Sequence, residues 1–268
     1  MATPTTLEVE IRNHVGIVWF NRPEIRNALN PVVLKELGAT LKALEKDKGV
    51  RAIVLGGRGP AFCAGADLNW MKQAASFTKA QNAKDAQGLA DALWTLYNLK
   101  KPTVARIHGP AYAGGTGFVA ACDIAVASTD ATFCLSETRL GLTPSTISPY
   151  VLRAMGERSA SRYFLTAERF DAAEAYRIGF VHEIAPPEDL DGTVNEILGH
   201  LVQAGPRALD ETKKLIRLSG GTRLTPAVRV ATGRHIAETR ASAEGKEGIA
   251  SFLEKRRPKW VTDLKLDE

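Results

Sequence analysis

A glycine-rich turn between two apolar segments restricts the fold of this chain more than any other stretch. The apolar run over residues 102–107 predicts a buried strand, and residues 118–122 are compatible with a short buried helix. Between them, Gly114, Gly115 and Gly117 occupy three of four positions. Glycine has no Cβ, so the backbone of such a turn can approach a bound molecule closely. The N–H groups and the dipole at the start of the helix suit an oxygen that gains negative charge during a reaction.

Three interpretations of this turn compete. It can be a tightly packed connection without chemistry. It can be a dinucleotide fingerprint, because residues 115–120 fit the pattern G-x-G-x-x-A and the acidic Glu137 follows about 20 positions later. It can also be an oxyanion hole made of backbone N–H groups. Isolated glycine patterns often match by chance, so the rest of the chain has to distinguish the three.

Size and composition are those of an ordinary globular protein. The chain has 268 residues, of which 44% are hydrophobic and 24% charged, enough for a sizeable core and one large domain. No apolar run is long enough to span a bilayer, and the first ten residues lack the basic and apolar regions of a signal peptide. Three cysteines without metal-type spacing indicate a reducing compartment. We therefore expect a cytoplasmic protein that is not bound to a membrane.

Charge and ligand patterns disfavour nucleic acids and metals as partners. The net charge is +5, but basic and acidic residues are mixed nearly everywhere, and part of the excess lies in the tail at 255–259. Aromatic residues are not interleaved with basic ones as in single-strand binding proteins. The five histidines are scattered, and the sequence contains neither H-E-x-x-H nor G-x-S-x-G. A small anionic ligand is compatible with the mild positive charge.

The order of the expected elements is that of an α/β protein followed by helices. Strands are predicted over residues 7–12, 15–20, 51–55, 124–127 and 132–135, and helices over 31–48, 79–99 and from 142–149 to about 155. A second glycine-bearing loop, residues 58–68 around Ala66, also joins a strand to a helix. From about residue 200 only helical periodicity remains. We therefore predict a core domain over residues 1–200 and a helical part over 201–268.

Taken together, these segments resemble the enoyl-CoA hydratase/isomerase family, also called the crotonase family. The resemblance covers nearly the whole chain and rests on six segments in the family's order, residues 21–29, 61–68, 108–117, 122–127, 133–141 and 252–258. Each segment is weak evidence by itself, but six in order are specific. The resemblance implies an α/β fold, the crotonase (ClpP-like) spiral of β-β-α turns, with a helical C-terminal part that builds homotrimers or homohexamers.

The resemblance also implies the site residues. The backbone N–H groups of Ala66 and Gly114 would hold the thioester oxygen of an acyl-CoA substrate, and losing one such donor typically costs about 3–4 kcal/mol. The acid–base group would be Glu137, whose apolar surroundings in sequence would raise its pKa and make it a usable proton carrier. Without the family context, Glu137 would be taken as a surface or capping residue.

Binding of the coenzyme A part is expected at four positions, Arg26, Ala28, Ala64 and Asp67. Coenzyme A enters only as part of the substrate, and no metal or redox cofactor is implied. The dinucleotide interpretation becomes weaker, because two predicted strands intervene between the glycines and Glu137.

One departure from the family pattern concerns the acid–base chemistry. Typical hydratases of the family carry a second glutamate in the helix after the central glycines, and here that position is Gly117. This pattern and the run over residues 163–171 look most like bacterial methylglutaconyl-CoA hydratases of leucine degradation, and similarly like isohexenylglutaconyl-CoA hydratases. A single glutamate equally suits an enoyl-CoA isomerase. A non-catalytic acyl-CoA-binding homologue is a further alternative.

The missing glutamate suggests what the substrate supplies. A charge-assisted hydrogen bond is worth about 1.5–3 kcal/mol, so its loss needs compensation. We therefore expect reversible hydration of a branched, carboxylated enoyl-CoA, with 3-methylglutaconyl-CoA as best guess, whose own carboxylate replaces the absent one. The groups that would receive that carboxylate are sought nearby in sequence, in Ser145, Thr146, Ser148, Arg139 and Arg153.

Overall fold

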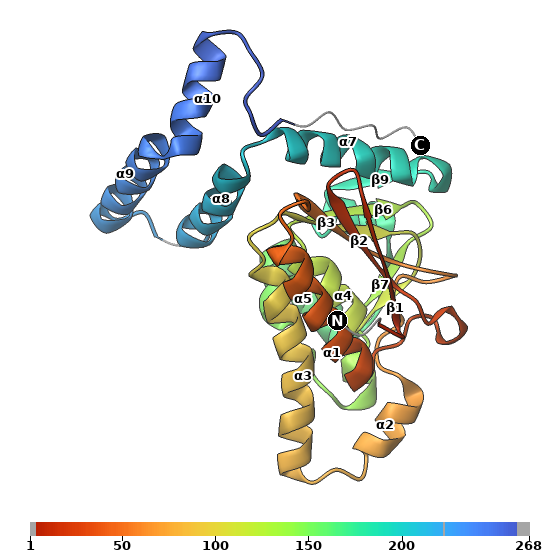
Figure 1. Cartoon of the computed structure of the whole chain (residues 1–268). Coiled ribbons are helices and arrows are strands. Elements are labelled where there is room, and N and C mark those ends of the chain that lie inside the picture. Colours follow the sequence, from red (N-terminus) through yellow and green to blue (C-terminus); the bar gives the residue numbers. More distant parts are fainter. Residues whose placement is uncertain (1–3, 222, 262–268) are drawn as a thin grey trace.

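The computed structural model describes residues 4–221 and 223–261 (Figure 1). Its main sheet has the strand order β1-β2-β3-β4-β6-β9 and a smaller sheet has the order β5-β7-β8. The strands are β1 (Leu7–Arg12), β2 (Val15–Phe20), β3 (Ala52–Gly57), β4 (Thr103–Ile107), β5 (Ala111–Tyr112), β6 (Ile124–Ser128), β7 (Thr132–Cys134), β8 (Arg169–Asp171) and β9 (Glu183–Ala185). The strands predicted over residues 7–12 and 15–20 are confirmed and form a hairpin, because β1 pairs antiparallel with β2, whereas β2, β3, β4, β6 and β9 run parallel.

Helices cover both faces of the main sheet and continue beyond it. They are α1 (Pro31–Lys46), α2 (Leu68–Ala74), α3 (Lys79–Tyr97), α4 (Gly114–Ala121), α5 (Ser148–Thr166), α6 (Ala172–Arg177), α7 (Leu190–Gln203), α8 (Pro206–Ser219), α9 (Pro226–Ala241) and α10 (Ala243–Leu253), with short 3₁₀ helices at Pro23–Ile25, Glu137–Leu140 and Pro187–Asp189. No helix of the described residues is both long and apolar enough to cross a membrane.

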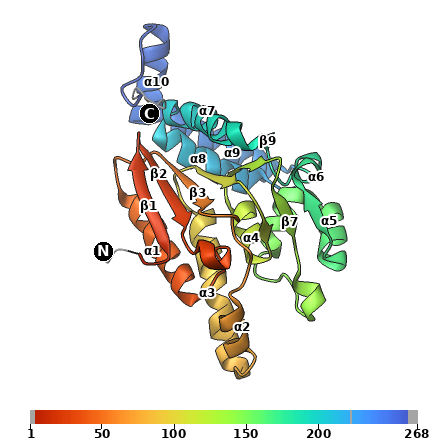
Figure 2. The same ribbon diagram turned by 90° about the vertical axis from the view of Figure 1, so that its right-hand side faces the viewer.

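The sheet separates two apolar cores. Helices α1, α3, α4 and α5 pack on one face, where the larger core lies. Helix α7 covers the other face through Leu190, Val194, Leu198 and Val202, which meet valines of β2, β3, β4 and β6. Figure 2 shows α7 on one side of the sheet and α3 on the other. Parallel strands buried on both faces explain the continuous apolar runs in the sequence.

Local signals place α1 and α3. The side chain of Asn30 accepts hydrogen bonds from the backbone N–H groups of Val32 and Val33, and Pro31 follows at the first helical position. The apolar stripe of α1, formed by Val33, Leu34, Leu37, Leu41 and Leu44, is buried, and α1 packs against α3. Thr78 begins α3 with a capping box to Gln81.

Two of the element boundaries that differ from the prediction have a local explanation. The strand expected to end at Leu55 continues to Gly57, because β2 offers pairing partners for Gly56 and Gly57 at Trp19 and Phe20. The helix expected to end near residue 155 continues to Thr166. It is interrupted at Gly156, whose φ of 74° and ψ of 161° are not helical, so the chain bends there and then resumes the helix.

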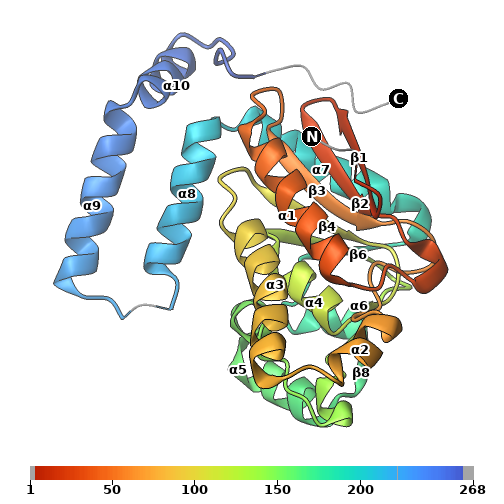
Figure 3. The same cartoon turned by 60° about the horizontal axis from the view of Figure 1, so that its bottom comes forward.

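The last three helices, α8, α9 and α10, extend away from the rest of the chain (Figures 1 and 3). They are attached by a short ion pair from Lys213 Nζ to Asp123 Oδ2, 2.6 Å long. The guanidinium of Arg51 donates to the carbonyl oxygens of Ala204 and Trp260. Several large apolar side chains on these helices remain exposed, Ile216, Leu218, Val230, Ile236, Ile249 and Phe252. The division of the chain near residue 201 stays a prediction.

Candidate active site

Two glycine-bearing loops meet at the candidate site. The loop after β3 and the turn after β4 exchange backbone hydrogen bonds, from Cys63 N to Pro110 O (3.1 Å) and from Tyr112 N to Cys63 O (2.9 Å). Gly65 has a φ of +93°, and a Cβ placed on it would lie 3.2 Å from the Cβ of Ala113. The two loops are therefore in direct contact one residue before Ala66 and one residue before Gly114.

The N–H groups of Ala66 and Gly114 stay available while their neighbours are engaged. Asp67 N donates to Leu29 O (2.8 Å) and Leu29 N donates to Gly65 O (2.7 Å), on either side of Ala66. Among residues 4–221 and 223–261, neither Ala66 N nor Gly114 N has a hydrogen-bond acceptor. Two free donors from two loops in contact form an arrangement that can stabilise an oxyanion.

An unusual backbone conformation sets the start of α4. Ala113, which precedes the helix, has a φ of 47° and a ψ of −118°. Its N–H donates to Cys134 O at the end of β7 (2.8 Å), and its carbonyl oxygen accepts from Thr116 N (3.0 Å). Non-glycine residues in such conformations cost of order 1–3 kcal/mol and persist where the surroundings hold them. The bond to β7 therefore fixes the turn from which Gly114 N projects.

Glu137 lies at the same edge of the smaller sheet as this turn. Strands β5 and β7 are parallel, with Tyr112 opposite Cys134, so the segments that follow them leave in the same direction. Gly114 comes two residues after β5, and Glu137 comes three residues after β7. The glutamate is held by Leu142 N, which donates to its carbonyl oxygen (3.0 Å). The structure thus brings Gly114 and Glu137 to one edge of the smaller sheet, and Ala66 lies in the loop that contacts the turn of Gly114.

The carboxyl group of Glu137 is partly buried. Its Oε2 is covered and has no hydrogen-bond partner in the part of the chain that the structure describes. Burial raises the pKa of Glu137 above its ordinary value, since water no longer stabilises the charged form. A carboxyl with a raised pKa and an unused oxygen is suited to taking up and returning a proton near neutral pH.

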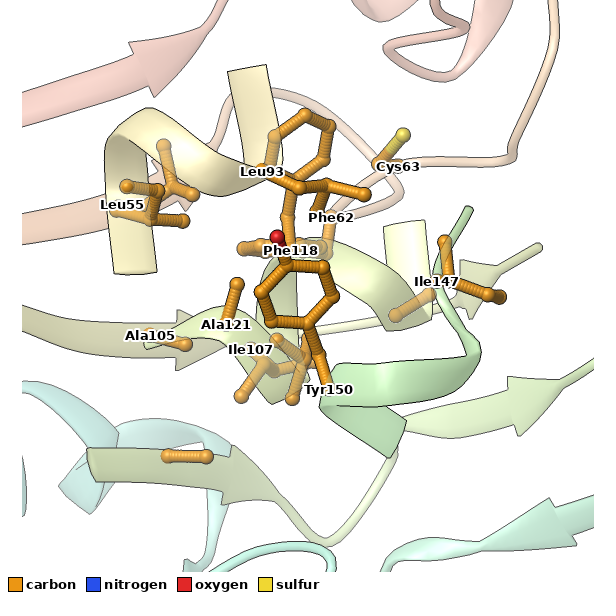
Figure 4. Packing of buried hydrophobic residues seen from close by; sticks show 14 of the residues in the cluster. Leu55, Phe62, Cys63, Leu93, Ala105, Ile107, Phe118, Ala121, Ile147 and Tyr150 are labelled. Carbon is orange, nitrogen blue, oxygen red and sulfur yellow. The ribbon is translucent and has the colours of Figure 1, made fainter. Parts of the chain in front are cut away.

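The position of the absent second glutamate is closed. A Cβ placed on Gly117 would overlap Cγ2 of Ile147 and lie 2.9 Å from its Cβ and 3.4 Å from Cδ2 of Leu93. Ile147 is 1% exposed and lies beside α4 at the start of α5 (Figure 4). No side chain fits at position 117 without movement of the core.

The four predicted coenzyme A positions lie in two segments that touch. Ala64 N donates to Arg26 O (2.9 Å), which joins the N-terminal loop to the loop after β3. The side chain of Arg26 is exposed, whereas Ala28 is buried. Asp67 has structural partners, because its carboxylate caps α2 at Asn69 N and pairs with Arg22 (2.9 Å). Coenzyme A contacts at Arg26, Ala28, Ala64 and Asp67 stay a prediction.

Sequence reasoning missed Asn27, which joins the same two segments. Asn27 is 1% exposed and has a left-handed φ of 57°. Its Nδ2 donates to the carbonyl oxygens of Arg58 (2.8 Å) and Ala61 (2.7 Å), and its Oδ1 accepts from Arg22 N (2.9 Å). The signal that could have indicated it is asparagine in a turn-rich loop, because asparagine tolerates the left-handed region.

The residues expected to bind a substrate carboxylate do not all lie together in the structure. The hydroxyls of Thr143 and Ser145 share a hydrogen bond (2.6 Å), and Ser148 Oγ donates to Ser145 O (2.9 Å). Arg139 is exposed next to Glu137 in the short 3₁₀ helix. Arg153, however, lines a cavity with Ala120 and Cys122 at the C-terminal end of α4, the end opposite Gly114.

Comparisons with known proteins show related sequences and related folds. The family model of enoyl-CoA hydratase/isomerase matches residues 10–263. An enoyl-CoA hydratase structure from Shewanella pealeana has a TM-score of 0.93 at 36% identity and covers 96% of each chain. The structure of Pseudomonas aeruginosa AtuE has a TM-score of 0.91 at 36% identity and covers 96% of this chain and 100% of its own.

A named relative gives the same result at the level of sequence. The short-chain-enoyl-CoA hydratase of Clostridium acetobutylicum is 32% identical over 251 residues, which are 93% of this chain and 95% of that protein. The predicted crotonase fold is confirmed by the solved structures that share it. The chain therefore belongs to the enoyl-CoA hydratase/isomerase, or crotonase, family.

Proposed function

We propose that this protein catalyses the reversible addition of water across the 2,3-double bond of an enoyl-CoA thioester. The observation that carries the proposal is that two free backbone donors, Ala66 N and Gly114 N, come from loops in contact, while Glu137, whose buried carboxyl oxygen has no partner in the described chain, follows the strand paired with β5. The family and the hydratase names of its relatives support the same reaction.

In the proposed reaction each group has one task. The charged carboxylate of Glu137 takes a proton from water while the water oxygen bonds to C3 of the substrate. The electrons of the double bond move toward the thioester, whose oxygen becomes negative and is held by Ala66 N and Gly114 N. Glu137 then returns the proton to C2, which completes the 3-hydroxyacyl-CoA product. The chemistry needs no further cofactor, and we expect activity to be unchanged after treatment with a chelator.

The proposed substrate is a branched enoyl-CoA with its own carboxylate, with 3-methylglutaconyl-CoA as best candidate and 3-hydroxy-3-methylglutaryl-CoA as product. Two features support it. The sequence pattern around Gly117 is the one that resembles methylglutaconyl-CoA hydratases, and the core beside Gly117 has no room for a second glutamate. The substrate carboxylate would then be the second polar partner of the reacting water. An isohexenylglutaconyl-CoA would satisfy the same requirement.

Double-bond isomerisation is the second candidate. It is favoured by the same observation, since moving one proton between two carbons of a 3-enoyl-CoA requires one carboxyl group and an oxyanion hole, but no held water. Glu137 with Ala66 N and Gly114 N would be sufficient for it.

One assay separates these functions. The purified chain is given 3-methylglutaconyl-CoA, crotonyl-CoA and a 3-enoyl-CoA, and the products are identified by chromatography with mass detection. We expect hydration, with kcat/KM for the carboxylated substrate at least about tenfold higher than for crotonyl-CoA, or about 1.4 kcal/mol. Equal values would remove the substrate carboxylate from the proposal. Activity on the 3-enoyl-CoA alone would favour the isomerase, and binding without turnover would indicate a non-catalytic protein.

A further inference from the structure

Position 117 is placed to influence the reaction, although it has no side chain. It lies three residues after Gly114 in α4, and residues three apart on a helix are neighbours on one face. A side chain there would extend from the helical turn directly behind the donor Gly114 N. The atoms that occupy this space belong to Ile147, which is 30 residues away in sequence.

Ile147 is fixed in this place by its backbone. Its carbonyl oxygen accepts the first two hydrogen bonds of α5, from Tyr150 N and Val151 N, both 3.1 Å. The preceding turn is closed by Ser148 N, which donates to Pro144 O (2.9 Å). Ile147 is also enclosed in the larger core, so it cannot turn aside into solvent.

The segment that carries Ile147 is also attached to Glu137. Leu142 N donates to Glu137 O, and the chain from Leu142 leads over five residues to Ile147. The acid that remains in the site and the side chain that blocks position 117 therefore belong to one continuous stretch.

We propose that Ile147 is a specificity-determining residue, because its side chain excludes any side chain at position 117 and so limits the site to the single protein carboxyl of Glu137. The reacting water then lacks a second charged partner from the protein, and substrates that bring their own carboxylate are selected. The proposal has a steric part, that Ile147 excludes a side chain at position 117, and this part depends only on the contacts around Gly117. It also has a selective part, that carboxylated substrates are preferred, and this part rests on the proposed hydratase function.

The steric part is tested by thermal unfolding, which does not depend on activity. Wild type is compared with three variants, which are Gly117→Ala, Ile147→Gly and the double variant that combines both substitutions. Glycine at position 147 is compatible with the backbone, because this residue precedes the first turn of α5, although removal of the buried side chain lowers Tm in both Ile147→Gly variants. We expect Gly117→Ala to lower Tm in the wild-type background. In the Ile147→Gly background it should leave Tm unchanged or raise it, since alanine is the better helix former. An equal effect of Gly117→Ala in both backgrounds would overturn the proposal.

The selective part is tested with paired variants. Gly117→Glu combined with Ile147→Gly places a carboxylate in the vacated space, and Gly117→Gln combined with Ile147→Gly is the uncharged control of the same size. The measured quantity is the ratio of kcat/KM for 3-methylglutaconyl-CoA to that for crotonyl-CoA. We expect the glutamate pair to lower this ratio at least tenfold relative to wild type, through better crotonyl-CoA hydration, and the glutamine pair to lower it less.

Each outcome of this second test decides one question. A ratio that stays at the wild-type value in a folded glutamate pair would overturn the selective role of Ile147. An equal fall in the glutamate and glutamine pairs would also overturn it, because the effect would then be one of space and not of charge. If wild type hydrates neither substrate, the proposed function fails, while the thermal test of the contact between positions 117 and 147 is unaffected. If the glutamate pair does not fold, the thermal cycle with alanine decides whether Ile147 excludes a side chain.

Discussion

Replacing Glu137 by glutamine separates the chemical role of this residue from its cost to stability. Glutamine keeps the size and shape of the side chain but cannot take up or return a proton. General acid–base groups contribute about 10²–10⁴ in rate. We therefore expect kcat to fall at least about 100-fold, which corresponds to about 2.7 kcal/mol of barrier. The two donors Ala66 N and Gly114 N remain in the variant, so a residual rate should be measurable.

The same substitution should not reduce stability at neutral pH. Burial raises the pKa of Glu137 in the folded protein above its ordinary value of 4.5, so the folded state holds its proton more tightly than the unfolded state does. The stability that Glu137 contributes is therefore complete below pH 4.5 and is lost as pH rises through the folded pKa. At pH 8 wild type contains a buried charge that the variant lacks. We expect the variant to have a Tm equal to or higher than that of wild type at pH 8. At pH 4, the Tm of the variant relative to that of wild type should be lower than it is at pH 8.

The assay is the initial rate of hydration over a pH series, combined with thermal unfolding at pH 4 and pH 8. Glu157→Gln on the exposed surface of α5 is the matched control and should change neither quantity. In wild type, kcat/KM should fall at acidic pH as Glu137 becomes protonated, and the midpoint of this fall should lie above pH 4.5 because the pKa of Glu137 is raised. This fall should be absent in Glu137→Gln. Turnover at the wild-type rate in Glu137→Gln would remove this residue from the mechanism. A clearly lower Tm at pH 8 would refute the inference that its burial is costly.

Three further predictions concern assembly and the loops. Light scattering should give three or six times the 28.9 kDa mass of the chain, since the apolar side chains of α8–α10 are exposed in the single chain, and a monomer mass would contradict this. Arg26→Ala should raise KM for the acyl-CoA roughly fivefold at unchanged kcat, about 1 kcal/mol for an exposed ionic contact, whereas an unchanged KM would remove Arg26 from coenzyme A binding. Asn27→Ala should lower the free energy of unfolding by about 2–3 kcal/mol in urea titrations, because the buried carbonyl oxygen of Ala61 and the partly buried one of Arg58 lose their donor, and a loss below about 0.5 kcal/mol would show that they find other partners.

Local sequence signals were sufficient for much of the fold. The hairpin of β1 and β2 and the capped, amphipathic α1 could be predicted because their causes lie within a few residues, in alternation, in Asn30 and in the apolar stripe. The short strands of the smaller sheet are harder to predict, because β5 has only two residues and exists through its pairing with β7. The bend of α5 depends on the left-handed conformation of Gly156, which the residue type permits but does not require.

The candidate site likewise has features that the sequence could predict and features that depend on the fold. Glycine turns around Ala66 and Gly114 can be recognised in the sequence, and the structure places these two turns in contact, with Glu137 after the strand paired with β5. The burial of the Glu137 carboxyl and the hydrogen bonds of Asn27 depend on segments distant in sequence, so neither could be derived from local patterns. The dual role of Asp67, which caps α2 and pairs with Arg22, likewise follows only from the fold.

The pair formed by Gly117 and Ile147 has a consequence for how the site can change. The resemblance to typical hydratases of the family, which carry a glutamate where this chain has Gly117, suggests that one substitution could restore that glutamate. The contact with Ile147 makes that single step unfavourable, because the new side chain would enter a filled core before it could contribute to the reaction. Loss of Ile147 alone is also unfavourable, since it leaves a cavity, and large-to-small core substitutions of this kind typically cost about 2–5 kcal/mol. Gly117 makes room for Ile147, and Ile147 in turn disfavours any larger residue at position 117, so packing would help to maintain the site that we propose, with Glu137 as its one catalytic carboxyl.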